Sequence, residues 1–115
     1  MKLISAETAR VTIEMAGDVE TAKRWLRRFC YGRGLCVTVE PQTFIYTGGE
    51  EVGFSVGLLN YPRFPSELPA LEARALEIAE GLIVECCQKT ALIVGPRLTQ
   101  WLTLDPPGMR TAVTP

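Results

Sequence analysis

The sequence contains no histidine among its 115 residues. Histidine is the usual general base near neutral pH and a common metal ligand, so its absence excludes Ser-His and Cys-His nucleophiles and most zinc sites. Acid or base catalysis would fall to Tyr46, Tyr61 or a glutamate. We therefore expect a protein that is not an enzyme and that uses no cofactor and no metal.

The sequence also lacks a large net charge and a long apolar run. Twelve basic and thirteen acidic residues give a net charge of −1, so no general attraction to nucleic acid or to an anionic membrane is expected. No apolar stretch approaches the roughly 20 residues that cross a bilayer, and the first residues lack the apolar core of a signal peptide. These absences predict a cytoplasmic protein without membrane or strong nucleic-acid binding.

The composition indicates one globular domain. Hydrophobic residues make up 47% and charged residues 22% of the chain, which are ordinary values for a folded protein. We expect a single domain over residues 1–104 and a proline-rich tail over 105–115. The four cysteines are predicted to be free, buried thiols, because two are adjacent in a helical stretch and two lie in apolar patterns; they are Cys30, Cys36, Cys86 and Cys87.

Periodicity predicts the element order β-α-β-β-α-β. Alternating segments and helical stripes follow one another, with Asp18 and Ser66 as N-caps of the two helices and Pro41 as a kink in, or a break between, strands. The second helix is expected to reach about Lys89, and Gly48–Glu50 is expected to form a hairpin turn. The order is that of a ferredoxin-like α+β fold: an antiparallel sheet with two helices on one face and an optional extra C-terminal strand.

The second arm of the hairpin alternates bulky and small side chains. The bulky set should pack beneath the helices, while Gly53, Ser55 and Gly57 face the open side of the sheet; the bulky set is Val52, Phe54, Val56 and Leu58. Glycine within a strand accommodates twist or a bulge, or marks the close approach of a ligand or another subunit. All three interpretations stay open at this point.

The loop "NYPRFP" supplies groups that could bind a small molecule. Tyr61 and Phe64 can stack on a ring, Arg63 can pair with a carboxylate or phosphate, and Asn60 can pair with an amide or a base edge. Prolines would hold these groups in place. The alternative is a stiff connection whose aromatic side chains pack into the core.

Two helical features point to further contacts. Arg27, Arg28 and Tyr31 lie on the polar face of the first helix, either as a phosphate-binding patch or as a solvated face near the helix C-terminus. On the second helix, a stripe separate from the main apolar face suggests association into a homo-oligomer; it consists of Leu76, Ile83 and Cys87.

Two segments carry a resemblance to a known group. "VTIEMAGDVETAK" and "FCYGRGLCVTVEPQTFIYTGGEEVGFSVGLLNYPRFP" resemble small uncharacterised proteins encoded by tailed bacteriophages and prophages, over residues 10–102. The most distinctive parts are "CVTVEPQTFIYTGGEE" and "GLLNYPRFP". The resemblance implies a viral origin, hence the host cytoplasm, and carries over no activity, cofactor or site residue.

These observations favour a small, non-catalytic, oligomeric binding protein. It would capture an anionic, ring-bearing small molecule such as a nucleotide signal of antiviral defence, with the strand glycines as a floor and the loop and helix arginines as recognition groups. The alternative is a protein-interaction module that docks on a host or virion protein. A cofactor-free enzyme is the third hypothesis, and the lack of histidine ranks it last.

Overall fold

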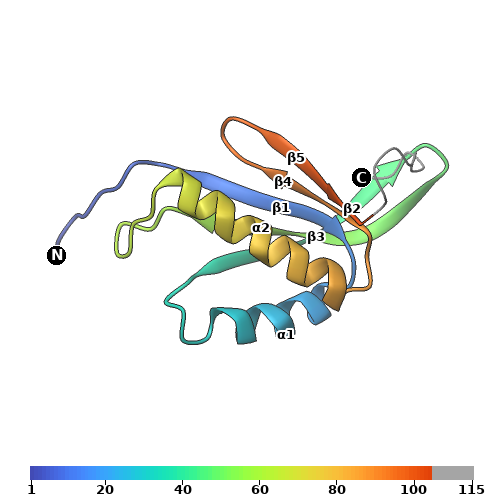
Figure 1. Cartoon of the computed structure of the whole chain (residues 1–115), viewed down its shortest axis with the longest axis horizontal. Helices are drawn as coiled ribbons and strands as arrows, with labels where there is room; N and C mark the ends of the chain where they lie inside the picture. Colours follow the sequence, from blue (N-terminus) through green and yellow to red (C-terminus); the bar gives the residue numbers. More distant parts are fainter. Residues whose placement is uncertain (105–115) are drawn as a thin grey trace.

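The computed structural model describes residues 1–104 and shows an α+β protein built from one antiparallel sheet and two helices (Figure 1). The predicted class is confirmed, and the optional last strand is present. The predicted tail, 105–115, lies outside the described residues. In chain order the elements are β1 (Arg10–Ala16), α1 (Val19–Cys30), β2 (Val37–Tyr46), β3 (Gly49–Leu59), α2 (Leu68–Glu85), β4 (Thr90–Val94) and β5 (Thr99–Thr103).

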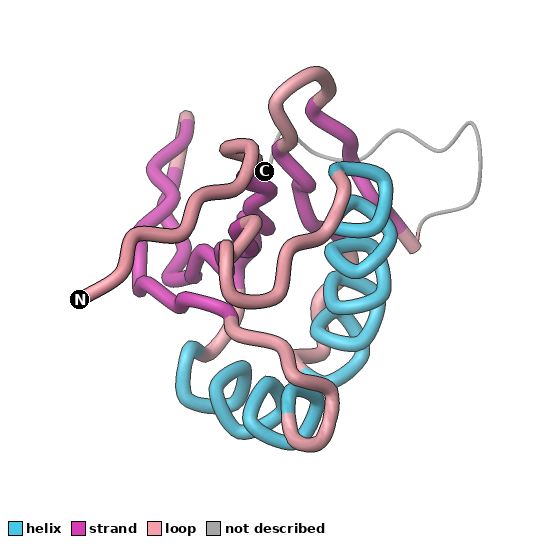
Figure 2. Tube along the Cα trace, turned by 90° about the vertical axis from the view of Figure 1, so that its left-hand side faces the viewer, coloured by secondary structure: helices cyan, strands magenta, loops and turns pink. Residues whose placement is uncertain are grey.

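The sheet has the strand order β2-β3-β1-β4-β5, and every neighbouring pair is antiparallel. In the central strand β1, Val11, Ile13 and Met15 are buried, whereas Thr12 and Glu14 between them point to the opposite face. Both helices pack on the buried face, and Figure 2 shows them to one side of the strands. The other face, which we call the open face, is covered by no helix of residues 1–104.

Strand β3 alternates as predicted over most of its length. Phe54, Val56 and Leu58 are buried in the core beneath the helices. Val52 was expected to join them but is 71% exposed. The β2–β3 hairpin runs on past the helices (Figure 1), so Val52 has no helix above it.

Strand β2 is continuous through Pro41. A single ten-residue strand runs from Val37 to Tyr46 at the edge of the sheet, where the missing N–H of a proline is tolerated. Tyr46 pairs with Gly49, so the hairpin turn is Thr47–Gly48, one residue earlier than predicted; Gly48 supplies the positive φ of 90°.

The two helices begin differently. The Asp18 carboxylate accepts hydrogen bonds from the Thr21 N–H at 2.9 Å and the Thr21 hydroxyl at 2.8 Å, which lower the pKa of Asp18 and confirm it as the N-cap of α1. The predicted cap of α2, Ser66, is wrong. Glu67 occupies that position without a side-chain hydrogen bond, and the Ser66 N–H donates instead to Asn60 Oδ1.

The stripe on α2 that was predicted to mediate association does not form one surface. Ile83 is buried in the core, whereas Leu76 is 43% exposed. Cys87 lies beyond the helix, which ends at Glu85 rather than near Lys89, because the chain turns out of the helix there. The Cys87 N–H donates to the Val84 carbonyl and the Gln88 N–H to the Ile83 carbonyl, which together form a Schellman cap.

The two helices contact each other where the Trp25 ring of α1 lies against Gly81 of α2. Trp25 stacks on Phe29 with ring centroids 4.9 Å apart. A Cβ atom added at Gly81 would lie within 2.5 Å of the Trp25 ring, closer than any real contact. Gly81 is therefore needed for the close approach of α1 to α2.

All four cysteines are free. Cys30 and Cys86 are half-buried, and burial raises the pKa of both thiols. Cys36 and Cys87 are exposed, so the prediction of buried thiols is wrong for these two. Within residues 1–104, neither helix is long and apolar enough to cross a membrane.

Replacing Cys87 with glycine should stabilise the protein. Cys87 has φ of 55°, in the left-handed region that costs a non-glycine residue about 1 kcal/mol, and it occupies the Schellman position that favours glycine. Thermal unfolding of Cys87→Gly should therefore show a Tm several degrees higher. Cys87→Ala removes the thiol but keeps the strained φ, so an equal gain in that variant would contradict this explanation.

Replacing Gly81 with valine should destabilise the protein by roughly 1–3 kcal/mol, because the side chain would displace Trp25 from its place on α2. Chemical denaturation measures the loss. Glu80→Val introduces the same residue at an exposed position one step along α2 and serves as the control. Equal losses in both variants would assign the effect to helix propensity and not to packing.

Candidate functional site

A row of side chains crosses all five strands on the open face. Strand register pairs Glu40 with Ser55, Ser55 with Glu14, Glu14 with Leu92, and Leu92 with Trp101. Residues paired directly across a sheet point to the same face and lie on neighbouring strands about 4.8 Å apart. We call this set the open-face row. It places two carboxylates on either side of a serine and an indole at its far end.

Glu14 occupies the centre of the open-face row. Its Oε2 atom is buried and has no hydrogen-bond partner within the described part of the chain. A buried carboxylate oxygen without a partner is costly, and natural proteins keep few of them. Glu14 lies in mid-sheet between Ser55 and Leu92, and no cation among residues 1–104 is paired with it, which suggests that its partner comes from outside this part of the chain.

The strand glycines are covered by neighbouring side chains. A Cβ at Gly57 would lie 2.5 Å from Thr38 Oγ1 and 3.2 Å from Nη2 of Arg10, so the Arg10 guanidinium lies beside Gly57. A Cβ at Gly53 would lie 2.6 Å from the Phe44 ring. Of the three predicted floor residues, only Ser55 presents a side chain between the two glutamates, with Arg10 and Phe44 on either side of it.

Tyr61 joins the Gly57 end of the open face. The Cys36 thiol donates a hydrogen bond to the Tyr61 hydroxyl at 3.1 Å. This hydrogen bond and the loss of solvent contact raise the pKa of Tyr61, against the opposing positive charge of Arg10 nearby. The structure thus brings Tyr61 and Arg10 to the same end of the sheet.

Most other residues of the predicted loop make contacts within the chain. The Asn60 side chain donates to the Glu7 carbonyl at 2.7 Å and accepts from the Ser66 N–H at 2.7 Å, which fixes the loop to the N-terminal segment. Tyr61 and Phe64 contact each other with ring centroids 5.3 Å apart. Arg63 is exposed. A binding role for Asn60, Arg63 and Phe64 stays a prediction.

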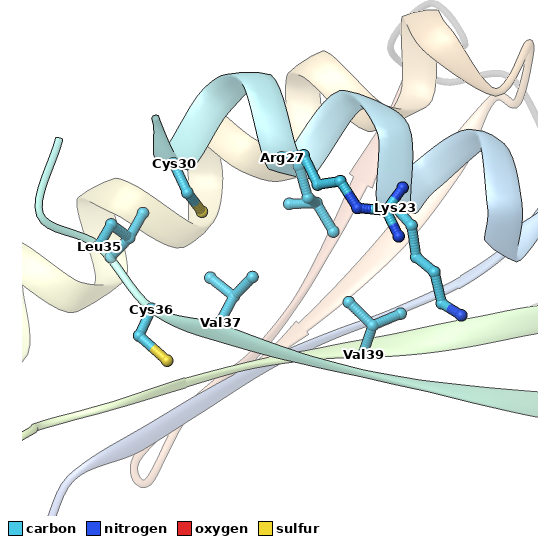
Figure 3. A pocket seen from close by; sticks show the side chains of 8 residues that line it. Lys23, Arg27, Cys30, Leu35, Cys36, Val37 and Val39 are labelled. Carbon is cyan, nitrogen blue, oxygen red and sulfur yellow. The ribbon is translucent and has the colours of Figure 1, made fainter. Parts of the chain in front are cut away.

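The helix residues of the predicted site lie on the other side of the sheet. Arg28 of α1 pairs with Glu85 of α2 at 3.3 Å, and Tyr31 is 88% exposed. Arg27 lines a separate groove between α1 and β2 (Figure 3). The sheet separates these three residues from Gly53, Ser55 and Gly57, so the ten predicted residues do not form one site within a single chain.

A groove with a volume of about 430 Å³ lies between α1 and β2 on the covered side of the sheet. Its walls are mostly aliphatic, and its two charged side chains, Lys23 and Arg27, are both cations. The side chains that line it come from Lys23, Leu26, Arg27, Cys30, Leu35, Cys36, Val37 and Val39. The groove and the open-face row therefore differ in the sign of their charge.

Sequence reasoning found Ser55 and the glycines but missed Glu14, Glu40, Arg10 and Trp101. Alternation placed Glu14 on the polar face of its strand, yet only the register shows that it faces Ser55. Among residues 1–104, no group of three or more histidine, cysteine, aspartate or glutamate side chains is arranged to hold a metal ion.

Comparison with known proteins gives a match at the level of fold. No protein-family model matches the sequence, and no curated protein does. The chain is similar to a phage SAM lyase solved in complex with S-methyl-5′-thioadenosine, with a TM-score of 0.59, 8% sequence identity, and coverage of 90% of this chain and 95% of that one. The phage SAM lyase in its apo state matches with a TM-score of 0.58 and 12% identity, over 90% of this chain and 98% of that one.

This finding corrects the function expected from the sequence. Both solved structures that share the fold are of an enzyme, which contradicts the prediction of a non-catalytic binding protein. The absence of histidine argues against catalysis only for reactions that need a side chain to gain or lose a proton near neutral pH. A reaction without such a proton transfer can be catalysed by a protein that has no histidine.

Replacing Glu14 with methionine should raise the stability of the protein by about 1 kcal/mol, because the buried, unpartnered Oε2 atom is removed while the side-chain volume is nearly kept. Glu40→Met is the matched control, since Glu40 is an exposed carboxylate in the same row. Urea denaturation of both variants measures the difference. A gain of equal size at Glu40 would show that added apolar surface, and not the orphan oxygen, is responsible.

Proposed function

We propose that this protein is a lyase that cleaves a sulfonium nucleoside, S-adenosylmethionine or a close analogue, on the open face of its sheet. The observation that carries the proposal is Glu14, a carboxylate at the centre of the open-face row with a buried oxygen that has no partner. The match in fold to a phage SAM lyase supports the choice of substrate.

The charges of the open-face row complement such a substrate. S-adenosylmethionine carries a sulfonium cation and an ammonium group, and the row provides the carboxylates of Glu14 and Glu40 on either side of Ser55. These carboxylates lie two strands apart, about 10 Å between backbones. The two cations of the substrate are four bonds apart, so both glutamate side chains would lean toward Ser55 for each carboxylate to pair with one cation.

The remaining groups of the open face suit the other parts of the substrate. Trp101 offers an indole face for the purine or for the sulfonium. The Arg10 guanidinium lies beside Gly57, which pairs with Thr12, two residues and about 7 Å along β1 from Glu14, and it can pair with the substrate carboxylate. The small side chains between them leave space for the substrate to approach the backbone.

The reaction does not require histidine. When the bond between the sulfonium sulfur and the methionine chain breaks, both electrons stay on sulfur, which becomes the neutral thioether of S-methyl-5′-thioadenosine. A neutral leaving group needs no proton from a general acid. The remaining fragment is completed without water or a proton transfer when its own carboxylate oxygen bonds to the carbon that sulfur leaves and closes a lactone.

The proposal extends to origin and assembly. We propose a bacteriophage origin, supported by the resemblance in sequence and by the phage source of the matching structures. Cleavage would then destroy a methyl donor on which host defence enzymes draw. A ferredoxin-like classification of the first six elements, a homo-oligomer and a host-protein partner each stay a prediction.

The test is incubation of the purified protein with S-adenosylmethionine, followed by chromatography and mass spectrometry of both product fragments. S-methyl-5′-thioadenosine is expected. Glu14→Gln should raise KM by roughly ten- to a hundredfold with a smaller change in kcat, because the pairing with the ammonium group exists before and during the reaction.

Two controls make the assay specific. Glu50→Gln changes an exposed carboxylate at the start of β3, next to the hairpin turn, and should leave KM unchanged. S-adenosylhomocysteine, whose sulfur is uncharged, should not be cleaved, because its sulfur would have to leave as an anion. No thioadenosine product from the unchanged protein, or equal kinetics for Glu14→Gln and Glu50→Gln, would refute the proposal.

A further inference from the structure

The groove between α1 and β2 exists because the helix covers the edge strand incompletely. Leu26, on the side of α1 that faces the sheet, is buried, whereas Val37 and Val39 of β2 are only half-buried. The space left between them is about 430 Å³, within the range of small-molecule sites. Leu35 closes the groove where the chain enters β2 (Figure 3).

The charges of the groove are of one sign and lie toward one end. Lys23 and Arg27 are one turn apart on α1 and extend over Val39, while Cys30 and Leu35 mark the other, uncharged end (Figure 3). Lys23 Nζ forms an ion pair with Glu20 Oε1 at 3.4 Å. Arg27 forms no ion pair within residues 1–104, although its neighbour Arg28 does.

The chemistry of the walls narrows the class of ligand. No aromatic ring and no side-chain amide is among the groove-lining residues, so a purine would find neither a stacking surface nor a partner for its edge. Two cations would repel a sulfonium. Leucine and valine side chains suit an aliphatic chain, and a free guanidinium suits a carboxylate.

We propose that the groove is a binding site for an unbranched aliphatic carboxylate of medium chain length, independent of the proposed lyase function. The carboxylate pairs with Arg27 and Lys23, and the chain runs over Val37 toward Leu35. From Lys23 to Cys30 the helix rises by about 10 Å, which is close to the extended length of octanoate.

The test is a titration of the full-length protein with sodium octanoate, followed by two-dimensional NMR of the backbone amides. Shifts should concentrate on α1 and on the first half of β2. Hexanoate should bind roughly fifteenfold more weakly, because each buried methylene contributes about a fourfold change in affinity. Octylammonium, which has the same chain and the opposite charge, should not produce these shifts.

A pair of variants separates the groove from the surface around it. Arg27→Gln should weaken octanoate binding about fivefold. Arg28→Gln, the same change one residue along α1 on the side that faces Glu85, should leave the affinity unchanged. Absence of shifts at millimolar octanoate, equal binding of octylammonium, or equal affinity in both variants would each overturn the proposal.

Discussion

The pairing of β1 with β3 on one side and β4 on the other is the interaction on which the rest of the structure depends. It aligns Ile13 with Val56 and Ile93 on one face, and this apolar layer is what the two helices cover. The same register aligns Glu14 with Ser55 and Leu92 on the other face. Because side chains alternate along a strand, a slip of one residue would bury the carboxylate in the core and expose the isoleucine.

Much of this arrangement could be predicted from local pattern. The alternating strand segments, the capping role of Asp18 and most of the bulky face of β3 depend on neighbours in sequence, and the structure confirms each. Val52 could not be placed in the same way. Its exposure depends on where α1 ends above the sheet, and no residue near Val52 encodes that length.

The candidate site was harder to predict than the fold because its members come from five strands. Ser55 was found because it sits in an unusual stretch, whereas Glu14 and Trp101 belong to segments that look ordinary by themselves. Gly53 and Gly57 were identified for a sound reason, a close approach. The approaching groups belong to the same chain: the Met15 carbonyl and the Phe44 ring at Gly53, and the Thr38 hydroxyl and the Arg10 guanidinium at Gly57. Their identity depends on strand register.

The sheet also separates two groups of side chains of opposite charge. Its open face carries the carboxylates of the open-face row, and its covered side carries Lys23 and Arg27 beside an aliphatic groove. A cationic group is attracted to the open face near Glu14 and Glu40, and an anionic group is attracted to the groove near Lys23 and Arg27. The net charge of −1 conceals this separation, because it sums over both faces.

The half-buried thiols have a consequence for the behaviour of the whole molecule. Burial moves the titration of Cys30 and Cys86 further above neutrality, and the sequence has no histidine to titrate below it. Few side chains are therefore left to gain or lose a proton between about pH 6 and pH 8. Mild acidification from about pH 8 to about pH 6 therefore changes the charge of neither a histidine nor these two thiols on this protein.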